Sequence, residues 1–132
     1  MSIDALFAAA LDVQGRAYAP YSGFKVGAAA QGESGAIYVG CNVENAAYPS
    51  GTCAEEGAIA AMVAAGERRI TAILVVGQGQ TLVTPCGACR QRIREFGAPG
   101  TLVHVASRDG VRSTFSLDDL LPSAFGPDNL RT

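Results

Sequence analysis

The 132-residue sequence predicts an α/β fold, a three-layer α-β-α sandwich with a mixed five-stranded sheet. Two continuous apolar runs, residues 71–77 and 101–107, are rich in branched side chains and are typical of strands buried on both faces. Each run follows a segment with helical spacing of its apolar residues. No linker, repeat or low-complexity tract interrupts the chain, so we expect one domain over residues 1–132.

The first half of the chain predicts a helix followed by a hairpin. Residues 3–18 repeat apolar side chains at helical spacing and should form a helix that ends before Pro20. Residues 24–31 and 36–43 are short strand candidates separated by Gly and Ser, which is typical of a hairpin.

The second half alternates helices with the two buried strands. Helices are expected over residues 52–66 and 86–97, one before each apolar run. A last short strand is expected near residues 112–117. The order helix, strand, strand, helix, strand, helix, strand favours a mixed sheet between layers of helices.

Composition limits the classes of function. Hydrophobic residues make up 48% and charged residues 17% of the chain, and the formal net charge is -2, without the basic excess of a nucleic-acid-binding protein. No apolar run approaches the ~20 residues of a membrane span, and residues 1–13 show no basic leader. We therefore expect a cytoplasmic protein without nucleic-acid or membrane partners. Because thiols stay reduced there, the four cysteines indicate a metal site or catalysis before disulfides.

The chemically distinctive residues lie where two helices are expected to begin. Cys53 and Glu55 fall in the first turn of the helix over residues 52–66, and Cys86 precedes the helix that contains Cys89. A helix N-terminus lowers the pKa of a thiol toward the thiolate that binds metal. The two-residue gap between Cys86 and Cys89 lets both sulfurs chelate one ion, with Cys53 as a third ligand. Three ligands leave one zinc position for water, and Glu55 could take a proton from that water.

Two other interpretations use the same residues. Thr52 and Glu55 have the spacing of a capping box, in which both side chains satisfy free donors at a helix end. Cys86 and Cys89 also have the Cys-x-x-Cys spacing of a redox dithiol near a strand–helix junction. Taken singly, each pattern leaves its alternative open.

Two further residues are interpreted as structural. Cys41 could supply a fourth sulfur, but it ends a predicted strand without a chelating neighbour, so we expect a small buried residue. His104, the only histidine, lies within a predicted strand and is expected to be a packed or edge residue. No Gly-x-Gly-x-x-Gly or phosphate loop indicates a nucleotide cofactor.

The combination of Cys-Ala-Glu with a later Pro-Cys-x-x-Cys is more specific than its parts and is similar to the zinc-deaminase signature. The stretches "YAPYSGFKVGAA", "CNVENAAYPSGTCAEEGA", "TPCGACRQRIREFG" and "LLPSAFGPDNL" extend the resemblance over nearly the whole chain. The sequence resembles the small, homotetrameric cytidine deaminases that act on free nucleosides. This resemblance implies a cytidine deaminase-like fold, a Zn²⁺ cofactor and a small-molecule nucleoside substrate. It also implies that the chain assembles as a homotetramer.

The resemblance also implies a role for individual residues. It implies zinc binding by Cys53, Cys86 and Cys89, and proton transfer by Glu55 as cytidine or deoxycytidine becomes uridine or deoxyuridine with release of ammonia. The substrate-binding positions that it implies are Asn42 and Glu44 on the ribose hydroxyls, Asn45 and Tyr48 nearby, Phe24 and the Ala54 backbone on the base, and Phe125 from a neighbouring subunit.

One position departs from the family pattern. Relatives often carry Arg directly after the catalytic Glu, where it offsets the charge of three thiolates, whereas this chain has Glu56. Because neighbours on a helix point ~100° apart, Glu56 need not face the metal, and Arg90 could supply part of the compensation. We expect a working site with altered electrostatics.

Two alternatives to cytidine deamination follow from the same residues. One is a deaminase of another aminopyrimidine nucleoside, such as blasticidin S. The other is a non-catalytic zinc or redox module, which should show four sulfur ligands or a dithiol that cycles.

Overall fold

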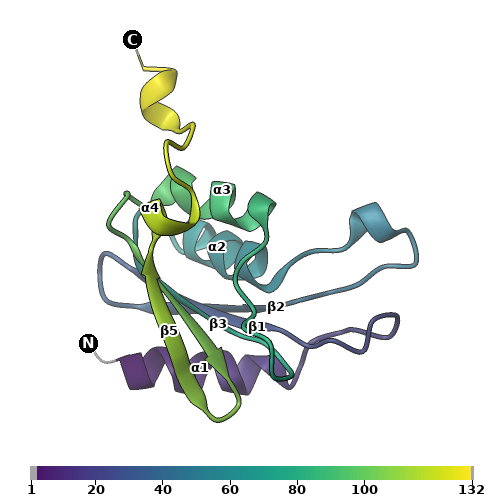
Figure 1. Cartoon of the computed structure of the whole chain (residues 1–132). Coiled ribbons are helices and arrows are strands. Elements are labelled where there is room, and N and C mark those ends of the chain that lie inside the picture. Colours follow the sequence, from purple (N-terminus) through teal and green to yellow (C-terminus); the bar gives the residue numbers. More distant parts are fainter. Residues whose placement is uncertain (1–2, 132) are drawn as a thin grey trace.

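The computed structural model describes residues 3–131 and confirms the expected sandwich around a mixed five-stranded sheet. The strand order is β2-β1-β3-β4-β5, and only the β3–β4 pair is parallel. Figure 1 shows α1 on one face of the sheet and α2 and α3 on the other. The strands are β1 (Gly27–Gly32), β2 (Ile37–Cys41), β3 (Ile70–Val76), β4 (Leu102–Ser107) and β5 (Gly110–Ser116).

The helices follow the expected order with two differences. They are α1 (Ile3–Gln14), α2 (Ala54–Ala64), α3 (Gly87–Phe96) and the short α4 (Leu117–Leu120). α1 stops short of residue 18 because Gly15 follows it, and glycine costs about 1 kcal/mol in a helix interior. α4 was not expected from the sequence. It is stabilised by a reciprocal cap, in which Ser116 Oγ accepts from Asp119 N at 3.2 Å and Asp119 Oδ2 accepts from Ser116 N at 3.1 Å.

Small residues in β1 allow helices to pack closely on both faces of the sheet. Ala28 and Ala30 belong to the core under α2 and α3, whereas Ala29 belongs to the core under α1. All three alanines are fully buried. β3 and β4 complete both cores, which confirms that the two apolar runs are buried on both faces.

Two further structural expectations concern His104 and membrane spans. His104 lies in β4 with its Nδ1 atom 2.8 Å from Thr114 Oγ1 of the edge strand β5, which confirms a packed residue. Within residues 3–131, the helices are too short or too polar to span a bilayer.

A close contact between β2 and α2 fixes the helix that begins at the candidate site. A Cβ atom on Gly40 would lie 2.3 Å from Ala58 N and 2.4 Å from Ala54 O, which is closer than any side chain can approach. Glycine is therefore required at this position for α2 to pack against β2.

Replacing Gly40 by Ala is expected to lower the free energy of unfolding by about 1–3 kcal/mol, because the added methyl group must displace α2. Urea unfolding measures the loss. Gly100→Ala is the matched control, since a Cβ there meets nothing within 4 Å and its φ is not positive. Equal stability of the two variants would contradict the prediction.

Candidate active site

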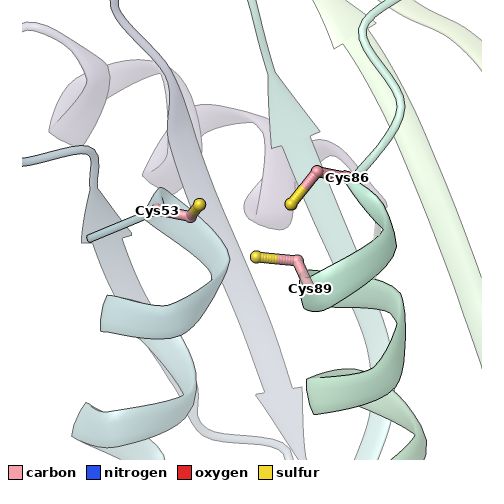
Figure 2. A group of neighbouring side chains, drawn as sticks. All are labelled: Cys53, Cys86 and Cys89. Carbon is pink, nitrogen blue, oxygen red and sulfur yellow. The ribbon is translucent and has the colours of Figure 1, made fainter. Parts of the chain in front are cut away.

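Three cysteines converge from the N-termini of two helices. Cys53 is the N-cap residue of α2, Cys86 is the N-cap residue of α3, and Cys89 lies in the first turn of α3. Their sulfur atoms all lie within 4.8 Å of one another, and Figure 2 shows them pointing toward a common centre. Cys41 is not part of this group, and it is half-buried, whereas the sequence predicts a buried residue.

Strand direction explains why the two helix ends meet. β1 is antiparallel to both β2 and β3, so β2 and β3 run in the same direction. α2 follows β2 and α3 follows β3, and both helices cover the same face. Both N-termini therefore lie beside the carboxyl edge of the same two strands, where α/β sheets commonly place their sites.

The three thiols fit a zinc ion. Sulfur atoms bound tetrahedrally at about 2.3 Å from zinc lie roughly 3.8 Å from each other, which the clustered side chains can reach with small rotations. Burial raises the pKa of Cys53 and Cys89. Burial also acts to raise the pKa of Cys86, but hydrogen bonds from Cys89 and Cys53 outweigh it and leave that pKa lowered. A cation is needed for three such neighbouring thiols to ionise together.

Glu55 is a buried carboxyl group beside the thiols. Its side chain is 5% exposed, and it lines the same cavity as Cys53 and Cys86. Burial raises its pKa, and the positive charge of Arg92 opposes part of that rise. A raised carboxyl pKa suits a group that accepts and returns a proton near neutral pH.

Glu55 does not cap α2. Cys53 is the N-cap residue, and its backbone N–H donates to Glu56 Oε1 at 3.3 Å. The alternative interpretation, a capping box of Thr52 and Glu55, is therefore wrong by one residue. Because Glu56 satisfies the Cys53 N–H, the Glu55 side chain is not needed for that helix-end donor.

Arg92, and not Arg90, brings positive charge to the cysteines. Arg90 donates to the carbonyl oxygens of Pro85 at 2.7 Å and Leu120 at 2.8 Å, so backbone acceptors hold its guanidinium. Arg92 Nη1 donates to Cys89 Sγ at 3.5 Å, and its Nη2 lies 3.8 Å from Glu56 Oε2. Glu56 thus pairs with an arginine at the site.

Replacing Glu56 by Arg is expected to lower the free energy of unfolding by about 1 kcal/mol. The variant loses the acceptor for the Cys53 N–H and places a second guanidinium beside Arg92. Adding Arg92→Gln should recover part of the loss, because it removes the repulsion but not the missing cap. Urea unfolding of the zinc-loaded proteins measures both effects, and a Glu56→Arg variant as stable as the parent would refute the assigned cap.

A cavity of about 640 Å³ extends from the thiols toward the surface, within the usual size of a small-molecule site. Most of the predicted substrate-binding residues line it. Phe24 and Phe125 are not among the lining residues; Phe24 is 38% and Phe125 is 58% exposed. The predicted residues in the lining are Asn42, Glu44, Asn45, Tyr48, Ala54 and Glu55, with Cys53 and Cys86.

Other lining residues were not singled out from the sequence. Tyr21 and Ser22 come from the loop before β1, and Val83 and Thr84 come from the loop after β3. For Ser22 the Ser-Gly pair marks a turn, but nothing in the sequence shows which carboxylate the serine binds. Arg92 follows Cys89 by three residues, the helical spacing that could have indicated their contact.

An α-β-α sandwich that presents three thiols and a buried carboxyl group at two helix N-termini defines a class of protein, the zinc-dependent deaminases. The family model of the cytidine and deoxycytidylate deaminase zinc-binding region matches residues 1–105. The chain belongs to this family.

Individual relatives agree in sequence and fold. The crystal structure of cytidine deaminase from Burkholderia pseudomallei superposes with a TM-score of 0.88 and 46% identity, covering 95% of this chain and 100% of that chain. The crystal structure of cytidine deaminase from Mycobacterium tuberculosis gives a TM-score of 0.81 and 37% identity over 96% of this chain and 98% of that chain. A cytidine deaminase of Sporosarcina psychrophila is 41% identical over 130 residues, 98% of this chain and 96% of its own length.

Proposed function

We propose that the protein catalyses the zinc-dependent hydrolytic deamination of cytidine and deoxycytidine to uridine and deoxyuridine, with release of ammonia. The observation that carries the proposal is a single cavity that joins the cysteine group and buried Glu55 to a polar rim. Family membership supports the same reaction. A blasticidin S deaminase or a non-catalytic module has no comparable support.

The reaction needs a nucleophile and a movable proton. Zinc held by Cys53, Cys86 and Cys89 would lower the pKa of a water molecule toward neutrality. Glu55 accepts the proton of this water and passes it to the ring nitrogen beside the carbon under attack. Glu55 then takes the second proton, that of the new hydroxyl group on the attacked carbon, and gives it to the departing amino group as the carbonyl forms, so that one water and one cytidine yield one uridine and one ammonia. The low exposure of Glu55 keeps this proton away from bulk water.

The lining favours a nucleoside over a nucleotide. Within the described part of the chain, the cavity is lined by no Lys or Arg, and its ionisable side chains include the carboxyl groups of Glu44 and Glu55. Phosphate binding commonly uses Arg or Lys. Carboxylate and amide groups, by contrast, suit neutral sugar hydroxyls.

Asn42 and Glu44 are proposed to bind the ribose, with Asn45 and Tyr48 beside them. The Asn42 side chain also accepts from Val26 N at 2.9 Å and donates to the Phe24 carbonyl oxygen at 2.8 Å. It therefore fixes the segment that carries Phe24, whose ring we propose packs on the base when substrate is bound. The Ala54 backbone is proposed to contact the base from α2.

A homotetramer in the cytoplasm is the proposed working form. Phe125 lies on the C-terminal segment, which extends away from the sheet in Figure 1, and its carbonyl oxygen accepts from Gln91 Nε2 at 2.8 Å. An exposed phenyl ring outside its own cavity suits a group that enters the site of a neighbouring subunit. Tyr48, which is 77% exposed at the cavity rim, would be covered in the same assembly.

The proposed function is tested by the ultraviolet absorbance of cytidine mixed with the purified protein, after elemental analysis for zinc. Conversion to uridine with equimolar ammonia is expected, and cytidine monophosphate should be a poor substrate. Bound zinc without turnover of cytidine or deoxycytidine would refute the proposal. Blasticidin S in a parallel reaction distinguishes the alternative deaminase.

A further inference from the structure

Two serine turns with the same hydrogen-bonding pattern lie at opposite ends of β1. Ser22 N donates to Glu44 Oε1 at 3.1 Å, and Ser34 N donates to Glu67 Oε1 at 3.0 Å. In each turn the serine hydroxyl donates to the other oxygen of the same carboxylate. Each serine Oγ also accepts from the backbone N–H two residues later, at 3.0 Å in the first turn and 3.2 Å in the second. The pattern itself is therefore a general way to fix a turn.

The two turns differ in their surroundings. Ser22 and Glu44 line the candidate active-site cavity, whereas Ser34 and Glu67 are not among its lining residues. Ser22 Oγ accepts a hydrogen bond from the backbone N–H of Phe24. The Ser22 hydroxyl therefore connects the Glu44 carboxylate to the loop that carries the Phe24 ring.

The hydrogen bonds of this turn leave little of the Glu44 carboxylate free. A carboxylate offers about four acceptor positions. Oε1 accepts from Tyr21 N at 2.9 Å and from Ser22 N at 3.1 Å, and Oε2 accepts from the Ser22 hydroxyl. One position therefore remains, and it is on the oxygen that Ser22 Oγ contacts. The same hydroxyl, helped by the backbone N–H groups, lowers the pKa of Glu44 and keeps it an ionised acceptor.

We propose that Ser22 is a positioning residue for sugar recognition: its hydroxyl holds the Glu44 carboxylate so that the remaining acceptor position on Oε2 meets a sugar hydroxyl. This inference rests on the proposed function, in which Glu44 binds the ribose. Ser22 itself need not touch the substrate. Its effect on binding should therefore require both Glu44 and a 2′ or 3′ hydroxyl on the sugar.

The test compares Ser22→Ala with the matched control Ser34→Ala in the zinc-loaded protein. Ser22→Ala should raise the KM for cytidine by roughly five- to tenfold, the usual net effect of losing one hydrogen bond, with kcat within about twofold. Ser34→Ala should leave KM unchanged. Ser22→Thr retains the hydroxyl and should recover most of the parental KM.

Two further measurements separate this role from general loosening of the loop. The inhibition constant of 2′,3′-dideoxycytidine, which lacks the 2′ and 3′ hydroxyls and keeps only the 5′ hydroxyl, should be the same for the parent and Ser22→Ala. In a Glu44→Gln background, Ser22→Ala should raise KM no further.

Each contrary outcome has a definite meaning. A KM for Ser22→Ala equal to that of Ser34→Ala would overturn the inference while leaving cytidine deamination intact. Weaker inhibition by 2′,3′-dideoxycytidine, to the same degree as the rise in KM, would also overturn it, because the loss would then act on the base through Phe24. Failure of the parent protein to convert cytidine would overturn the proposed function first, and the inference with it.

Discussion

Replacement of Glu55 by Gln is expected to lower kcat for cytidine by roughly 10²–10⁴-fold, the usual contribution of a general acid–base group. Glutamine keeps the shape of the side chain but cannot carry the proton. Zinc content should be unchanged, because the three thiols remain. Stability should be equal or greater, because a buried carboxyl group with a raised pKa is replaced by a neutral amide. Absorbance kinetics, elemental analysis and thermal unfolding measure the three quantities.

The neighbouring Glu56 provides the matched control. Glu56→Gln keeps the acid at position 55 and weakens both the cap at Cys53 and the ion pair with Arg92. It should lose about 0.5–1 kcal/mol of stability and retain most of the turnover. The opposite result, in which Glu55→Gln unfolds more easily and turns over normally, would restore the capping interpretation of Glu55.

The sheet could be predicted from the sequence because its central strands carry an unambiguous pattern. The apolar runs at residues 71–77 and 101–107 have no polar face, so only burial on both sides accommodates them. The end of α1 and the presence of α4 could not be predicted in the same way. A four-residue helix shows no periodicity, and its stability comes from the local cap between Ser116 and Asp119.

The candidate site could be predicted only to the extent that its chemistry is local in sequence. Cys86 and Cys89 share one helix turn, and Cys53 with Glu55 shares another, so their spacing carries information. The sequence pattern places the N-cap of α2 at Thr52, whereas the structure places it at Cys53, so that Glu56 and not Glu55 completes the cap. Sequence patterns do not resolve a helix start to one residue.

Contacts between distant parts of the chain gave no sequence signal. The hydrogen bond between the side chains of Ser22 and Glu44 joins residues 22 positions apart in the sequence, and only the fold brings them together. The pairing of Arg92 with Glu56 likewise depends on how α3 packs against α2. Such contacts determine how the active-site groups are held, whereas the residue types determine what those groups can do.

Replacement of Cys89 by Ala is expected to abolish both zinc binding and turnover. Cys89 is fully buried between the other two thiols and Arg92, so water cannot readily replace its sulfur as a ligand. Bound zinc should fall from about one ion per chain to almost none, with a lower melting temperature because metal no longer stabilises the folded state. Cys41→Ala is the control and should keep zinc and activity, since Cys41 lies outside the sulfur group. Loss of zinc in both variants would instead indicate a four-sulfur structural site, which would leave no coordination position for water and would refute the catalytic role of the metal.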